Sequence, residues 1–385
     1  MATEPLAERL EDRPDLVMFS RLAMLVPDLS LVLHAFPLDP ALPGLVLATD
    51  PEELMVMLGP ALTSAVEGLT LQGCGVEVVR YGRGTCVLRY ELVWRLQPSR
   101  RTLKQVVYGK VYRDAAGALV GPAVSALRRE SLGGRNALPF LVPRFQAYLP
   151  DLRLTLLEAV PGAPQLPALI RARAGAGLPP APAELTARDA VRTAGRIAAA
   201  LHESSAPTGP ARTFADELDR ARAEVEDLAP LAPRLASALH EHLDEPQSVA
   251  ADVPMASTVA HGDFDLSRVL FDGPTSSVVE FGTICHAEPG LDLGRFTASL
   301  AVTARRAEEA AGTGDGAEAL GPAFLREYLR QRDNSGDVDF LMARVEAYRT
   351  IALVRLAVRS WCELKSQRLG PTLALLERRQ HARGL

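Results

Sequence analysis

The chain has 385 residues, of which 48% are hydrophobic and 23% are charged, a composition that suits a compact globular protein and excludes extended disorder. Its net charge of -5 and the lack of a concentrated Lys/Arg run argue against a nucleic-acid partner. No apolar run approaches the roughly 20 residues of a membrane-spanning helix, and residues 1–15 lack the apolar centre of a signal peptide, so we expect no membrane partner and a cytoplasmic location.

Residues 1–70 precede the first predicted sheet and are expected to form an extension that packs on the region after it. Residues 36–44 contain several prolines and predict an irregular connection. At Asp50-Pro51-Glu52-Glu53 an N-cap aspartate is followed by a proline at the first helical position and by two acids. This combination predicts that a helix begins there.

Three runs rich in Val, Leu and Tyr follow, at 76–81, 85–94 and 105–112, and they predict strands. Gly82-Arg83-Gly84 joins the first two runs as a hairpin, which could cover phosphates. Lys110 lies within the third run, where an unpaired ammonium would be costly to bury, so it should have an anionic partner. On their own, however, a two-glycine loop is more often only a turn, and a strand lysine more often faces water.

Further along, residues 123–132 predict a helix, and the apolar run 152–160 predicts a strand that ends at a Pro-Gly turn. Residues 175–182 are rich in Gly, Pro and Ala and predict a loop.

Four helical patterns make up most of the second half. Thr186, with Asp189 three residues later, predicts the start of a long packed helix. The helix at 215–228 carries many acids, which could bind a cationic substrate. More often, acids interleaved with basic residues in this way form a solvated helix face of ion pairs. Apolar residues at helical spacing predict further helices at 323–331 and 338–369.

The segment 261–270 reads HGDFDLSRVL and carries the chemistry that we consider most informative. We expect a short polar loop that leaves a helix and presents Asp263, a carboxylate able to take a proton from an attacking hydroxyl. Glu280 follows an apolar run of the kind that forms a short buried strand, at a place suited to a metal ligand. Two acids on adjoining loops can share a phosphate site. Because Asp263 is the acid able to take the hydroxyl proton, it is the candidate catalytic residue.

These residues resemble the aminoglycoside phosphotransferase-like proteins of the protein-kinase-like fold. The family pattern is His-Gly-Asp, four residues, then Asn or Gln, and later an acid-Phe pair and an Asp-Leu segment, which here begin at Glu280 and Asp292. Where the family has its metal-binding Asn or Gln, this chain has Arg268, which carries only donors and a permanent charge and cannot ligate a cation. Where the family has Asp, the longer Glu280 offers magnesium a displaced carboxylate. Arg268 could neutralise phosphate charge directly, or it could pair with Glu280 and fill the metal site.

The resemblance implies a two-lobed α+β fold. The small N-lobe, at 71–160, would contain an antiparallel sheet, and the larger C-lobe, at 161–385, would be mainly helical and carry the catalytic loop. Residues 1–70 would form a helical extension that packs on the N-lobe.

The resemblance also implies a site for ATP and Mg²⁺. Lys110 would touch the nucleotide phosphates and pair with Glu130, and adenine would bind the backbone of an interlobe hinge. His261 would brace the catalytic loop, and Asp292 would act as an orienting acceptor or as the N-cap of a helix at 293–302. The full set of cofactor-binding candidates is Lys110, Glu130, Gly82, Gly84, Glu158, Ala159, Val160 and Arg268.

Two functions follow. The first is an ATP-dependent phosphotransferase that acts on a hydroxyl of a small molecule, with Glu280 holding magnesium. The second is a pseudokinase that binds nucleotide or a partner without phosphoryl transfer, because Arg268 and Glu280 pair and exclude the metal. A helical interaction protein is a remote third interpretation, and the strands around Lys110 argue against it.

Overall fold

The computed structural model describes residues 23–29, 31–63, 68–82, 84–133, 137–177, 185–206, 209–244, 246, 255–312, 319–332 and 337–382. The predictions for residues 1–15, for Arg83 of the hairpin and for the loop residues 178–182 therefore lie outside the described residues. Within these ranges, no helix combines the length and the apolar character that crossing a bilayer requires. The chain divides into two compact units, Met1–Ser125 with Pro143–Ala159 and Ala126–Val142 with Val160–Leu385.

The described part of the first unit begins with a strand pair and two helices. The antiparallel strands β1 (Ala23–Val26) and β2 (Leu31–His34) were not predicted. They precede α2 (Leu45–Ala48) and α3 (Pro51–Thr63). The predicted start of α3 is confirmed, because Asp50 Oδ1 accepts hydrogen bonds from the backbone N–H groups of Glu52 and Glu53 at 2.9 and 3.2 Å.

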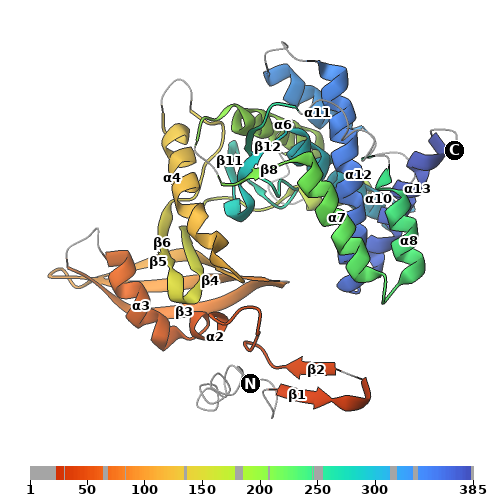
Figure 1. Cartoon of the computed structure of the whole chain (residues 1–385). Helices are drawn as coiled ribbons and strands as arrows, with labels where there is room; N and C mark the ends of the chain where they lie inside the picture. The colour runs from red at the N-terminus through yellow and green to blue at the C-terminus, as the bar shows by residue number, and fades with distance from the viewer. Residues whose placement is uncertain are drawn as a thin grey trace. The chain divides into compact units, whose positions relative to one another are not determined.

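A five-stranded antiparallel sheet follows, in the order β3-β4-β5-β7-β6 (Figure 1). It confirms the predicted hairpin and third strand. Leu88, Tyr90 and Leu92 are buried at alternate positions of β4, and the Tyr90 hydroxyl donates to Ala48 O at 2.9 Å, so the sheet packs on the segment of α2. The strands are β3 (Leu69–Gly82), β4 (Thr85–Leu96), β5 (Arg101–Tyr112), β6 (Phe145–Leu149) and β7 (Leu154–Glu158).

Strand β7 is shorter than predicted, and β6 was missed. The predicted strand begins at Leu152, but Leu152 ends a short 3-10 helix and Arg153 takes a left-handed conformation with φ 48°. The strand can begin only after this turn, at Leu154.

The second unit is mainly helical, as predicted, and contains two small sheets (Figure 1). Strand β12 (Cys285–Ala287) lies between β8 (Ala211–Arg212) and β9 (Thr258–Ala260), and β10 (Val269–Asp272) forms a hairpin with β11 (Thr275–Val278). The helices are α5 (Leu166–Arg173), α6 (Ala187–Glu203), α7 (Phe214–Leu228), α8 (Pro233–Glu241), α10 (Gly290–Ala311), α11 (Leu320–Gln331), α12 (Val338–Cys362) and α13 (Ser366–Ala382), while α4 (Val120–Ser131) crosses the boundary between the units.

Two helix predictions need correction. The helix predicted at 338–369 is two helices, because α12 ends at Cys362 and Leu364 has a left-handed conformation with φ 54°. No Gly or Pro marks this break in the sequence, and the apolar spacing continues across it. Helix α10 begins at Gly290, so Asp292 lies in its first turn and is not its N-cap. The start of α6 is confirmed, since Thr186 Oγ1 accepts from Asp189 N at 3.1 Å.

Candidate active site

The loop at 261–268 follows a strand, β9, and not the predicted helix. Gly262 has φ +74°, a conformation that L side chains rarely adopt. A Cβ at this position would collide with Thr283 O and lie 2.6 Å from Arg212 Nη1. The chain therefore needs glycine here in order to turn and present Asp263.

Asp292 anchors the backbone of this loop from the first turn of α10. Its fully buried carboxylate accepts from the N–H groups of His261 and Gly262, at 2.7 and 2.9 Å. His202 Nε2 lies 3.3 Å from the same carboxylate, and its Nδ1 lies 3.0 Å from the Tyr328 hydroxyl. Burial alone would raise the pKa of Asp292. The hydrogen bond and charge of His202, together with His261, outweigh burial, so the pKa of Asp292 is lowered. The loop is thus held by an ionised acid.

The side chain of His261 links the loop to the residues after β11. Its Nε2 lies 3.0 Å from Val279 O, and Asp263 N donates to its Nδ1 at 3.3 Å. Only the tautomer with its proton on Nε2 satisfies both contacts. Burial lowers the pKa of His261, so this neutral imidazole persists at neutral pH.

The β10-β11 hairpin brings Arg268 and Glu280 together. Val269 pairs with Val278, so Arg268 immediately precedes the hairpin and Glu280 closely follows it. Val279 N donates to Arg268 O at 3.0 Å, and Glu280 then turns with a left-handed φ of 68°. The register of one hairpin thus explains why two residues twelve positions apart in the sequence meet.

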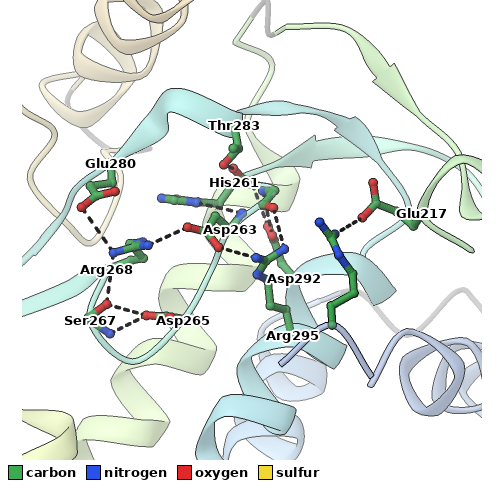
Figure 2. A network of polar contacts seen from close by, with 12 residues as sticks. Glu217, His261, Asp263, Asp265, Ser267, Arg268, Glu280, Thr283, Asp292 and Arg295 are labelled. Carbon is green, nitrogen blue, oxygen red and sulfur yellow. Dashed lines mark hydrogen bonds and ion pairs between the residues drawn. The ribbon is translucent and has the colours of Figure 1, made fainter. Parts of the chain in front are cut away.

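Arg268 and Arg295 hold Asp263 between them in a chain of ion pairs (Figure 2). Arg268 Nη2 lies 2.6 Å from Asp263 Oδ2, and Arg295 Nη2 lies 2.7 Å from Asp263 Oδ1. On its other side, Arg268 Nη1 lies 3.4 Å from Glu280 Oε1. The side chain of Arg268 is 8% exposed and those of Asp263 and Glu280 are 20% exposed, so the chain is largely shielded from solvent.

This arrangement lowers the basicity of Asp263. Burial raises the pKa of Asp263, but the charges of Arg295 and Arg268 outweigh burial and hold it well below its usual range. Burial alone would lower the pKa of Arg268, and the charges of Asp263, Asp265 and Glu280 raise it instead. Asp263 is therefore ionised and a weak proton acceptor while both arginines contact it.

The residues at the family's metal position do not fit magnesium. Mg²⁺ requires near-octahedral oxygen ligands, whereas Arg268 offers only N–H donors there and directs one at Glu280. Among the residues that the structure describes, no cluster of three or more His, Cys, Asp or Glu side chains could hold a metal ion. Glu280 as a metal ligand stays a prediction, and its pairing with Arg268 disfavours it.

A small cavity lies beside the loop, between α7, α10 and α12. Its charged lining residues are Glu217, Asp265, Arg295, Arg355 and Arg359, and its volume is about 40 Å³. Because Arg295 also contacts Asp263, the cavity adjoins the candidate catalytic residue. Sequence reasoning missed Arg295, although its position three residues after Asp292 on one helix was a usable signal.

Glu217 and Glu224 of α7 are ion-paired with arginines. Glu217 is 1% exposed and contacts Arg212 at 2.6 Å and Arg355 at 3.2 Å. Glu224 also pairs with Arg355, at 2.6 Å. Ion pairs, one part of the more frequent interpretation of 215–228, are confirmed for these two acids, but Glu217 is buried and does not lie on the solvated face that was predicted.

Lys110 and Glu130, predicted to pair, belong to different units. Lys110 lies on β5, and its ammonium is 5.2 Å from the centre of the Tyr112 ring. Glu130 accepts from the hydroxyls of Ser204 and Ser205 within the second unit, at 2.6 and 3.1 Å. The Lys110–Glu130 pair and the convergence of Lys110 with the catalytic loop stay predictions.

The predicted phosphate-covering hairpin is the turn between β3 and β4. Gly82 pairs with Thr85 across this turn, and Gly84 has φ +74°. Contact of either glycine with phosphate stays a prediction.

The predicted hinge residues lie at the end of β7. Glu158 N donates to Arg144 O at 2.9 Å, and Ala159 N donates to Val106 O at 3.4 Å. The boundary between the two compact units falls between Ala159 and Val160. The backbone N–H groups of Glu158 and Ala159 are thus already used within the sheet.

Comparison with known proteins supplies a family and a fold. A family model described as the phosphotransferase enzyme family matches residues 110–328, more than half of the chain. None of the curated proteins compared matches the sequence.

Solved structures share the fold at low identity. An aminoglycoside phosphotransferase, APH(4)-Ia, is 12% identical with a TM-score of 0.50 and covers 83% of this chain and 98% of its own. A glucosamine kinase is 19% identical with a TM-score of 0.50 and covers 84% and 98%. A choline/ethanolamine kinase family protein from Mesorhizobium loti is 13% identical with a TM-score of 0.48 and covers 84% and 95%. The two structures with a TM-score of 0.50 confirm the predicted protein-kinase-like α+β fold.

Proposed function

Because the chain belongs to the phosphotransferase enzyme family, we propose that it transfers the terminal phosphoryl group of ATP to a hydroxyl of a small molecule. One observation carries the proposal: Arg295 contacts Asp263 and also lines a cavity beside the loop, so a hydroxyl compound with one end in that cavity would extend past Arg295 toward the candidate catalytic carboxylate. A variant of the APH(4)-Ia enzyme, which has the same fold, was solved with AMP-PNP and hygromycin B, a nucleotide analogue and a second small molecule. We infer a similar pair of ligands for this chain.

In the proposed reaction, the acceptor oxygen attacks the γ-phosphorus of ATP. The bond from the γ-phosphorus to the β–γ bridging oxygen breaks, ADP leaves, and the hydroxyl proton passes to Asp263 or to solvent. Because the pKa of Asp263 is low, its main contribution would be to orient the hydroxyl through a hydrogen bond. Lys110 would contact the phosphates from β5. Val160 would contact adenine, because the backbone N–H groups of the other two predicted hinge residues, Glu158 and Ala159, already form hydrogen bonds.

Arg268 would supply positive charge where the family places an amide ligand. Its guanidinium can form two parallel hydrogen bonds to phosphate oxygens, as arginine fingers do when they neutralise charge on the transferred group. To do so, Arg268 would have to exchange part of its contact with Asp263 or Glu280 for the nucleotide.

A second candidate function is a pseudokinase, and the contacts of Arg268 favour it. With ion pairs of 2.6 Å to Asp263 and 3.4 Å to Glu280, the guanidinium engages both acids of the site. If these pairs persist when nucleotide binds, Asp263 stays locked and the protein binds nucleotide without phosphoryl transfer.

A transfer assay with the full-length protein and γ-labelled ATP, paired with a thermal-shift titration by ATP, separates these functions. The enzyme predicts a labelled acceptor and a loss of about 100-fold or more in Asp263→Asn, with ATP still raising the melting temperature. Asp272→Asn, which changes an exposed acid of the neighbouring hairpin, is the matched control and should transfer normally. Stabilisation by ATP without any labelled acceptor would identify the pseudokinase, and no response to ATP would overturn both functions.

A further inference from the structure

Arg359 differs from the other two arginines that line the cavity. Arg295 is paired with Asp263 at 2.7 Å, and Arg355 is paired with Glu224 at 2.6 Å. The guanidinium of Arg359 makes no hydrogen bond or ion pair with any side chain in the part of the chain that the structure describes. The cavity wall therefore contains one uncommitted cation beside two committed ones.

Arg359 is exposed at the mouth of the cavity, so water solvates part of its charge, and its closest charged neighbours in the protein include two arginines. Desolvation, and then the positive charge of Arg295, lower the pKa of Arg359, and Arg355 acts in the same direction. Asp263 and Glu224 oppose this shift, but the net direction is downward. A group placed among like charges gains stability when an anion binds next to it.

The acids that line the cavity do not neutralise Arg359. Glu217 contacts Arg212 and Arg355, and Asp265 accepts from the hydroxyl and the backbone N–H of Ser267, both at 2.7 Å. The cavity volume of about 40 Å³ corresponds to roughly three water molecules, which is the size of a small oxyanion group and far less than an aminoglycoside needs.

We propose that this cavity binds an oxyanion group, a carboxylate or a phosphate, with Arg359 as its main contact. The inference rests on the proposed function and names its acceptor class: a small hydroxyl compound that carries a negative charge, and not a polycation. With the oxyanion at Arg359, the hydroxyl would extend past Arg295 toward Asp263, because Arg295 joins the cavity to that carboxylate.

The first test measures anion binding alone, without ATP. The probe is inorganic phosphate at constant ionic strength, followed by calorimetry and by thermal shift on the full-length protein. We expect phosphate to bind wild type and to bind Arg359→Gln at least about 10-fold more weakly, since the variant loses a charged hydrogen bond. Arg306→Gln, which removes an exposed arginine of α10 away from the cavity, is the matched control and should bind as wild type does. Equal binding by all three proteins, or binding by none, would overturn the proposal.

A second readout separates a ligand-binding arginine from a structural one. Without ligand, Arg359→Gln should melt at the same temperature as wild type or higher, because the change removes repulsion from Arg295 and Arg355. A melting temperature clearly below that of Arg306→Gln would show a structural role and count against the proposal.

The acceptor class is tested with pairs of hydroxyl compounds in which a carboxylate replaces a CH2OH group, such as glycerate with glycerol and gluconate with glucitol. Preferred labelling of the anionic members, lost in Arg359→Gln, is the expected result. Equal or better labelling of the neutral members would overturn the inference and leave the proposed function standing. Phosphate binding that depends on Arg359, without labelling of any acceptor, would support the oxyanion site and count against the proposed function.

Discussion

Replacing Arg268 with asparagine tests how this site differs from the family pattern. The variant restores an amide at the family's metal position and removes both ion pairs of Arg268. Removing one partner of a buried pair typically costs 3–5 kcal/mol. Asp263 would keep Arg295 at 2.7 Å, and Glu280 is 20% exposed and can be solvated, so we expect a smaller loss of about 2–3 kcal/mol in the free energy of unfolding.

The pH dependence of this loss follows from the pKa of Asp263. The two arginines hold that pKa below its unfolded value of about 4, so Asp263 contributes stability above pH 4, and this contribution is lost as the pH falls below it. Arg268→Asn moves the pKa back up. The difference in the free energy of unfolding between the two proteins should therefore be full at pH 7. It should narrow only as the pH falls below the folded-state pKa of Asp263 in the variant, which Arg295 still holds under the unfolded value of about 4.

Urea denaturation at pH 7 and pH 3 measures the stability change, and thermal shift with ATP, with and without magnesium, measures the gain of a metal site. We expect added magnesium to stabilise Arg268→Asn further, by about 1.4 kcal/mol at ten times its dissociation constant, and to leave wild type unchanged. Arg268→Lys, which keeps the charge without the planar fork, is the control and should fall between the two in stability. An unchanged free energy of unfolding in Arg268→Asn would refute the stabilising role of the ion pairs, and a magnesium response in wild type would refute exclusion of the metal.

Three further substitutions test the framework around the site. Asp292→Asn should lower the free energy of unfolding in urea by about 2–4 kcal/mol, because an amide N–H would face the donors of His261 and Gly262. Gly262→Ala should cost about 2 kcal/mol or more in the same assay and impair phosphoryl transfer, because its φ of +74° and its contact with Thr283 O leave no room for a Cβ. Hydrogen bonds, above all from Arg330, lower the pKa of Glu327 from 4.5 to about 2. Glu327 therefore stabilises the folded protein above pH 4.5, and this contribution is lost as the pH falls toward 2. Glu327→Gln should abolish this part of the acid dependence of the melting temperature.

Features that depend on local sequence patterns were predicted correctly. The hairpin of β3 and β4, the strand that carries Lys110 and the start of α3 depend on alternation, turn residues and caps within a few positions. The His-Gly-Asp triplet located the loop in the same way, because its three residues are adjacent in the sequence.

Features that depend on tertiary packing were not predicted. Arg295 and Arg359 lie on two helices, and only the packing of α10 beside α12 brings them to one cavity. The break after Cys362 lacks a Gly or Pro to mark it. Whether Arg268 pairs with Glu280 was open in the sequence, because the answer depends on the register of β10 with β11.

The two departures from the family pattern form one physical change. Arg268 places a positive charge where the family pattern has an amide, and the carboxylates of Asp263 and Glu280 form ion pairs with it. Glu280 reaches Arg268 at 3.4 Å, whereas the family's aspartate is shorter by one carbon–carbon bond, ~1.5 Å, and would end beyond ion-pair distance. The longer acid is therefore the residue that suits the arginine, just as the shorter acid and the amide together suit a metal ion. The site is built around an internal guanidinium, and under either proposed function the phosphates of a bound nucleotide would compete with Asp263 and Glu280 for it.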